Sequence, residues 1–122
     1  MKILLVDDDA FLRDMYATKF AEKGHTIESA ETAEIALTKL HESTFDVVLC
    51  DSIMPGMTGT ELLARVQSAM DIVKKPVCIM LSNQSEDADK EAAMKAGAVG
   101  YIVKAELIPS EVVAEVLKLV SK

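Results

Sequence analysis

The chain has 122 residues, 50% of them hydrophobic, 27% charged and 4% aromatic, and its net charge is -7. This length and composition are typical of one globular domain, residues 1–122, and exclude a disordered or repetitive chain. The negative charge argues against direct binding to nucleic acid, because it would repel the phosphate backbone. Neither a secretion signal nor an apolar segment of membrane-spanning length stands in the sequence, so we expect a cytoplasmic protein without membrane contact.

Five short aliphatic runs predict β-strands. Four of them are nearly continuous in Val, Ile, Leu or Cys, as strands buried on both faces of a parallel sheet should be. The second run along the chain is more polar and predicts an edge strand. The five runs cover residues 3–6, 26–29, 47–50, 77–81 and 99–103.

Helical periodicity fills the segments between these strands. The first helix is expected to end where Lys23 and Gly24 place a cation and then a glycine, a common helix C-terminus. Thr32 predicts the N-cap of the second helix, and Thr58 with Glu61 predicts a capping box at the start of the third.

The fourth helix, expected over residues 85–96, offers mainly alanines to the sheet, so it should gain the least packing energy and be the most mobile of the five. The fifth helix is expected to follow Pro109. Strict alternation of strands and helices predicts a doubly wound α/β domain with helices on both faces of a parallel sheet. Such folds bind ligands at the carboxyl ends of their strands.

Polar side chains follow four of the predicted strands. Asp7 and Asp8 come after the first strand and Asp51 after the third. Ser82 follows the fourth strand and Lys104 the fifth. Solvated loops would also be polar there, but three carboxylates with one hydroxyl and one ammonium suit Mg²⁺ together with a phosphoryl group. Asp8 and Asp51 could bind the ion directly, and Asp7 through water.

A simpler interpretation of Asp7, Asp8 and Asp9 is a solvated turn that caps the following helix. Against it stands the mutual repulsion of three adjacent carboxylates, which is unfavourable unless a cation or hydrogen-bond donors compensate. The triplet alone leaves both interpretations open.

Four segments carry a family resemblance: LLVDDD, VVLCDSIMPGMTG, IMLSNQ and GYIVKA. In order and spacing they resemble the signatures of the response-regulator receiver domain of two-component signalling, which includes the chemotaxis regulators. The resemblance spans essentially the whole chain. It implies one five-stranded parallel sheet in the order 2-1-3-4-5, a flavodoxin-like three-layer sandwich.

The resemblance also implies residue roles. Asp51, which precedes x-x-M-P, would accept a phosphoryl group from a phosphohistidine. Asp7 and Asp8 would hold Mg²⁺ together with Asp51 and the backbone carbonyl of Ile53, which leaves Asp9 as a helix cap. The domain would catalyse its own phosphorylation and dephosphorylation as a signalling switch, without being an enzyme that acts on a separate substrate.

By the same resemblance, Ser82 and Lys104 would bind the phosphoryl group, and Ser82 with Tyr101 would form a switch. That switch would act on a surface of the fourth helix, fifth strand and fifth helix, which would bind an unidentified downstream protein. The phosphodonor would be a histidine kinase or a histidine phosphotransfer protein, and the chain would be a monomer or a phosphorylation-dependent dimer. Ala105 replaces the proline that such families usually carry after the lysine, so the isomer of the preceding peptide and the reach of Lys104 are open.

Three other functions fit parts of the pattern. A phosphatase of the haloacid-dehalogenase type would need Thr or Val where Phe11 stands, and a flavodoxin would need a Ser/Thr-rich loop after the first strand. A receiver-like scaffold that is never phosphorylated would not need the full set of carboxylates, hydroxyl and lysine. The chain could be a complete regulator or the receiver of a longer protein.

Overall fold

A computed structural model of the chain describes residues 1–72 and 74–121. Strands and helices alternate along it, with a short 3₁₀-helix, η1 (Lys104–Glu106), after the last strand. The strands and α-helices are β1 (Lys2–Val6), α1 (Ala10–Glu22), β2 (Thr26–Ala30), α2 (Ala33–Glu42), β3 (Val47–Cys50), α3 (Gly59–Ser68), β4 (Val77–Ser82), α4 (Asp87–Lys95), β5 (Ala98–Val103) and α5 (Pro109–Val120).

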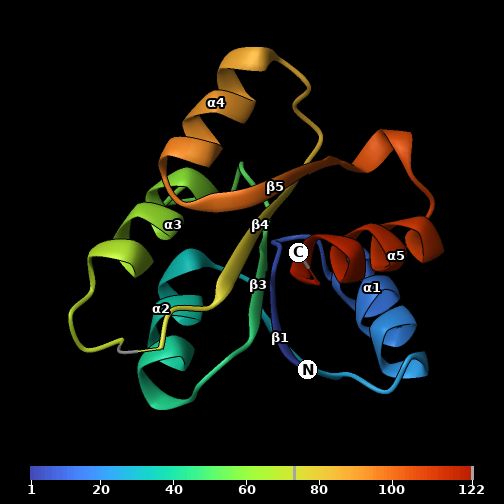
Figure 1. Ribbon diagram of the computed structural model, residues 1–122, viewed down its shortest axis with the longest axis horizontal. Coiled ribbons are helices and arrows are strands. Elements are labelled where there is room, and N and C mark those ends of the chain that lie inside the picture. The colour runs from blue at the N-terminus through green and yellow to red at the C-terminus, as the bar shows by residue number, and fades with distance from the viewer. Residues whose placement is uncertain (73, 122) are drawn as a thin grey trace.

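The five strands form one parallel sheet in the order β2-β1-β3-β4-β5, which confirms the predicted order and the edge position of β2. Helices α1 and α5 cover one face, and α2, α3 and α4 cover the other (Figure 1). Alternate side chains of the central strands enter the two cores: Leu4 and Val48 pack toward α2 and α3, while Ile3 and Val47 pack toward α1 and α5. Burial on both faces explains why these runs are continuously apolar.

The predicted helix ends are confirmed at three places. Gly24 adopts a φ of 85° just after the first helix, a left-handed conformation that glycine adopts without strain. The side chain of Thr32 accepts a hydrogen bond from the backbone of Ile35, and Thr58 and Glu61 form the expected capping box. The two N-terminal caps at Thr32 and Thr58 satisfy backbone N–H groups that have no partner within the helix.

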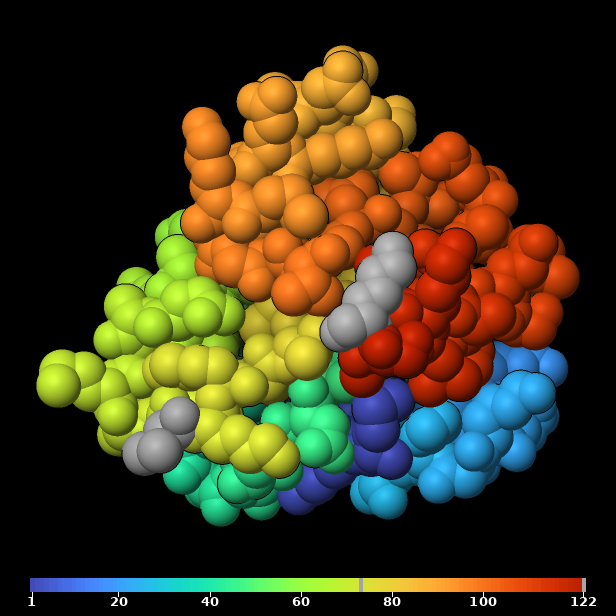
Figure 2. Space-filling model, in the orientation of Figure 1, coloured from blue at the N-terminus to red at the C-terminus, as the bar shows by residue number. Residues whose placement is uncertain are grey.

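Helix α4 differs from the prediction at its start, because it begins at Asp87 rather than at residue 85. The backbone N–H and carbonyl of Gln84 bond to Ser82 and Tyr101, residues 84–86 lie outside any helix or strand, and Glu86 keeps an extended backbone as the N-cap. Ala93 is the buried residue of α4, a helix that the structure describes in full. In Figure 2 this helix projects at the top of the molecule, in keeping with the small packing area predicted for it.

No helix within residues 1–72 and 74–121 is both long and apolar enough to cross a membrane.

Gly59 lets the start of α3 approach the end of β3. Its N–H donates to the carbonyl of Ser52 at 3.0 Å, and a Cβ at this position would lie 2.1 Å from the carbonyl oxygen of Asp51. Both neighbouring groups are backbone, which cannot rotate away as a flexible side chain can. The glycine therefore fixes how closely α3 packs beneath Asp51.

We expect Gly59→Ala to lower the free energy of unfolding by about 1 to 3 kcal/mol, because the added methyl group must push two backbone segments apart. Chemical denaturation of both proteins gives this difference. Thr60→Ala, one residue further along the same helix, is the matched control and should change stability by less than about 0.5 kcal/mol. A Gly59→Ala protein as stable as the parent would show that α3 can shift without cost.

Candidate functional site

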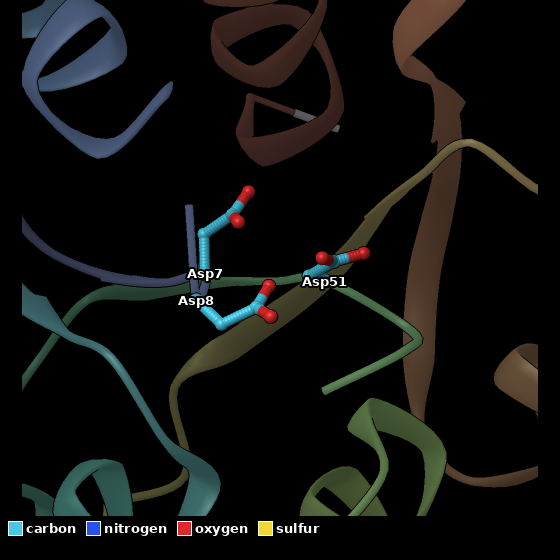
Figure 3. A group of neighbouring side chains, drawn as sticks. All are labelled: Asp7, Asp8 and Asp51. Atoms are coloured by element: carbon cyan, nitrogen blue, oxygen red, sulfur yellow. The ribbon is translucent and has the colours of Figure 1, made fainter. Parts of the chain in front are cut away.

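Three carboxylates converge at the carboxyl edge of the sheet. Val6 and Cys50 are paired in neighbouring strands, so Asp7, Asp8 and Asp51 leave β1 and β3 side by side. One carboxylate oxygen from each of the three lies within 4.8 Å of the others (Figure 3). Asp7 is 1% exposed, Asp51 is half-buried and Asp8 is exposed. The structure thus brings together the acidic trio that the sequence predicts, with an opening to solvent at Asp8.

Asp7 and Asp9 settle the two interpretations of the aspartate triplet. The side chain of Asp9 accepts a hydrogen bond from the N–H of Leu12 and caps α1, as expected. Asp7 instead points into the protein, where its Oδ1 accepts the N–H of Asp9 at 2.9 Å. The capping interpretation therefore holds for Asp9, and Asp7 belongs to the buried site.

Lys104 lies between the carboxylates of two strands. Its Nζ is 2.7 Å from Oδ2 of Asp7 and 3.4 Å from Oδ2 of Asp51, and its side chain is 6% exposed. Burial alone would lower the pKa of Lys104, but the hydrogen bond that Lys104 donates to Asp7 and the charges of Asp51 and Asp7 raise this pKa above its usual value. The ammonium is therefore fully charged at neutral pH.

The peptide between Lys104 and Ala105 is trans, because the described residues contain no cis peptide bond. The contacts of Lys104 with both carboxylates show that the side chain reaches the acidic site without the usual proline after it.

The carboxyl group of Asp51 has a raised pKa. Burial is the largest cause, and the negative charge of Asp7 adds to it. The charge of Lys104 and a hydrogen bond with the backbone of Ile53 act in the opposite direction without cancelling the increase. The ionised carboxylate of Asp51 is thus partly uncompensated, which favours any additional positive charge beside it.

Ser82 is fully buried at the end of β4, and its Oγ makes two hydrogen bonds. One joins it to Oγ of Ser52, and in the other it accepts the backbone N–H of Gln84 at 3.0 Å. The hydroxyl of Tyr101 donates to the carbonyl of the same Gln84 at 2.8 Å. Ser82 and Tyr101, the two predicted switch residues, are therefore joined through one backbone unit of the loop between β4 and α4.

A cavity of about 260 Å³ opens beside Asp51. Ile53 is 60% exposed and lines this cavity next to Asp51. The lining residues are Asp51, Ser52, Ile53, Ser82, Asn83 and Gln84.

Ser52 is a site residue that sequence reasoning missed. It directly follows Asp51 in the chain, and that hydroxyl beside a candidate nucleophile was the available signal. Its partner Ser82 lies 30 residues away, so only the packed structure identifies the pair.

The chain is similar in sequence to known response regulators. The response regulator receiver domain family matches residues 3–116. The chain is 37% identical over 105 residues to the chemotaxis protein CheY of Pseudomonas aeruginosa, covering 85% of this chain and 84% of that protein. It is 33% identical over 121 residues to the transcriptional regulatory protein ResD of Bacillus subtilis, covering 99% of this chain but 48% of ResD.

Several other relatives are also much longer, since the chain spans less than half the length of a Myxococcus xanthus gliding motility regulatory protein and a Pseudomonas aeruginosa regulator, PhoP. Among solved structures, the BeF3-activated DrrB receiver domain superposes with a TM-score of 0.83 at 25% identity, covering 99% of this chain and 97% of DrrB.

Asp51→Asn should raise the stability of the metal-free protein near pH 7, because it removes a charge that folding disfavours. A carboxyl group whose pKa is raised on folding costs no stability when it is protonated in both states, below its ordinary value of 3.8, and costs stability as the pH rises above that. The gain in the variant should therefore shrink as the pH falls toward 4. Urea denaturation in EDTA at a series of pH values measures it.

The exposed Asp14 provides the control, because Asp14→Asn removes the same charge at a solvated position of α1. The raised pKa of Asp51 would be contradicted if Asp51→Asn were no more stable than the parent at pH 7, or if its advantage in unfolding free energy grew as the pH fell.

Proposed function

Because the chain belongs to the response regulator receiver domain family, the receivers of phosphorylation-based two-component signalling, we propose that Asp51 is its phosphoacceptor. The supporting observation is the position of Asp51, which is half-buried beside Asp7 and Lys104 and open to a cavity large enough for a phosphoryl group. The phosphodonor is a histidine kinase or a histidine phosphotransfer protein.

The chemistry assigned to Asp51 is nucleophilic attack on phosphorus. A carboxylate oxygen forms a P–O bond while the P–N bond to the donor imidazole breaks, and the histidine leaves with the electron pair of that bond. The Lys104 ammonium, 3.4 Å from the carboxylate, neutralises charge on the phosphoryl oxygens. These groups are held by the fold before the donor arrives, so in this mechanism catalysis rests on positioning and electrostatics.

The acidic trio is suited to Mg²⁺. Mg²⁺ prefers oxygen ligands, uses one or two carboxylates and keeps several waters, and the three carboxylates lie within 4.8 Å of one another beside an exposed residue. In this proposal Asp8 and Asp51 bind the ion directly, Asp7 acts through water, and the carbonyl of Ile53 completes the protein ligands. The ion supplies positive charge that offsets the repulsion between the carboxylates and the incoming phosphoryl group.

The conformational response proposed for phosphorylation of Asp51 begins at Ser82, whose hydroxyl would donate to a phosphoryl oxygen. Movement of Ser82 displaces the backbone of Gln84 and thereby the hydroxyl of Tyr101, which is bonded to it. The affected surface is formed by α4, β5 and α5, where Met94 and Val99 are 47% and 48% exposed. A downstream protein would bind this surface in one of its two states.

Intact-mass measurement after incubation with acetyl phosphate and Mg²⁺ tests the assignment. We expect one added phosphoryl group in the parent and in Asp14→Asn, which removes an exposed carboxylate. We expect none in Asp51→Asn, and none in the parent when EDTA replaces Mg²⁺.

Undiminished phosphorylation of Asp51→Asn would place the acceptor elsewhere. A parent that gains no mass from acetyl phosphate or from a phosphorylated histidine phosphotransfer protein would instead be a receiver-like scaffold. Release of phosphate from p-nitrophenyl phosphate would support the phosphatase alternative.

A further inference from the structure

In this structure the buried hydroxyl of Ser82 takes part in two hydrogen bonds. Its Oγ is bonded to two groups among the described residues: the N–H of Gln84, which can only donate, and Oγ of Ser52, which can donate or accept. Ser82 is fully buried, and no described buried side-chain oxygen or nitrogen is left without a partner. The proton of Ser82 therefore has one available acceptor, the hydroxyl oxygen of Ser52.

The two serines differ in what else they can contact. Ser52 is half-buried and lines both the cavity beside Asp51 and a second one next to it, so its own proton can reach solvent. Ser82 also lines the cavity beside Asp51, but none of its surface is exposed to solvent. This difference in exposure favours the direction in which Ser82 donates and Ser52 accepts.

We propose that Ser52 is a positioning residue that accepts the hydroxyl proton of Ser82 in the unphosphorylated resting state. A phosphoryl group on Asp51 must then break this hydrogen bond before Ser82 can bind it, so Ser52 sets part of the free-energy cost of activation. This inference rests on the proposed function, since it assumes that Ser82 donates to the phosphoryl group. The same proton cannot serve both acceptors, so every phosphoryl contact made by Ser82 breaks its bond to Ser52.

The effect extends to Tyr101 through the loop. Ser82 accepts the N–H of Gln84 and the carbonyl of Gln84 accepts the hydroxyl of Tyr101, so a restraint on Ser82 also restrains the tyrosine hydroxyl. Ser52 lies in the loop after β3, and Tyr101 lies in β5, on the other side of β4. From that loop Ser52 opposes activation. Removing its hydroxyl should favour the activated state without touching the acidic trio or Lys104.

Binding of beryllium trifluoride, a tetrahedral mimic of a phosphoryl group on a carboxylate, tests the proposal; a BeF3-activated structure of the DrrB receiver is known. Titration of the Mg²⁺-loaded protein, followed by the NMR signal of Tyr101, gives the affinity and reports the switch. Ser52→Ala should bind the analogue about twofold to tenfold more tightly, because the resting state loses a hydrogen bond that the activated state does not make. Ser52→Thr keeps the hydroxyl and should stay close to the parent.

Two further variants separate this role from a general structural one. Thr60→Ala removes a hydroxyl that lines the same second cavity and should leave the affinity unchanged. In a Ser82→Ala background, Ser52→Ala should have no further effect, because the partner it restrains is already gone. Without Mg²⁺ or analogue, Ser52→Ala should also speed hydrogen exchange at the N–H of Gln84.

The possible failures are distinguishable. If the parent does not bind the analogue, or if Ser82→Ala binds it as tightly as the parent, the proposed function fails at this site. If the parent binds and Ser82→Ala weakens binding, but Ser52→Ala binds as tightly as the parent or more weakly, the role of Ser52 is overturned. The role of Ser52 would also be overturned if Ser52→Ala raised the affinity for the analogue equally in the parent and in the Ser82→Ala background.

Discussion

The ammonium of Lys104 between the carboxylates of Asp7 and Asp51 is the interaction on which the site depends. It joins the end of β5 to the ends of β1 and β3, across the centre of the sheet. A buried ammonium is strongly unfavourable unless it is paired, and here two carboxylates share it. One positive charge does not compensate both of them: burial and then the charge of Asp7 raise the pKa of Asp51, and Lys104 does not cancel the increase. The proposed Mg²⁺ and phosphoryl chemistry uses that imbalance.

The fold supplies this arrangement through parallel pairing. Strands that run in one direction place their carboxyl ends at one edge, so side chains distant in sequence become neighbours there. Gly59 lets α3 pack directly against the backbone of Asp51, which keeps Asp51 in place. The loop before α4 is held differently, through hydrogen bonds that Gln84 makes with Ser82 and Tyr101. In the proposed function these bonds change when Asp51 is phosphorylated, while the backbone of Asp51 stays in place.

The sequence predicted what local patterns determine. Continuous apolar runs identified the buried strands, the polar second run identified the edge strand, and Asp7, Asp51 and Lys104 were found because each follows such a run. Features that depend on packing were missed: the Ser52 and Ser82 pair joins distant residues, and the start of α4 depends on bonds of Gln84 to a neighbouring strand. The reach of Lys104 was also open until its contacts with both carboxylates were known.

Titration of the Asp51 carboxyl carbon, followed by ¹³C NMR in metal-free protein, measures how far the charge of Asp51 is compensated in the folded protein. We expect a midpoint above the ordinary pKa of 3.8 in the parent, a still higher midpoint in Lys104→Met, and a lower midpoint when Mg²⁺ is added. A midpoint at or below 3.8 in the parent, or one that Lys104→Met leaves unchanged, would contradict the claim that Asp51 is an incompletely compensated charge held beside Lys104.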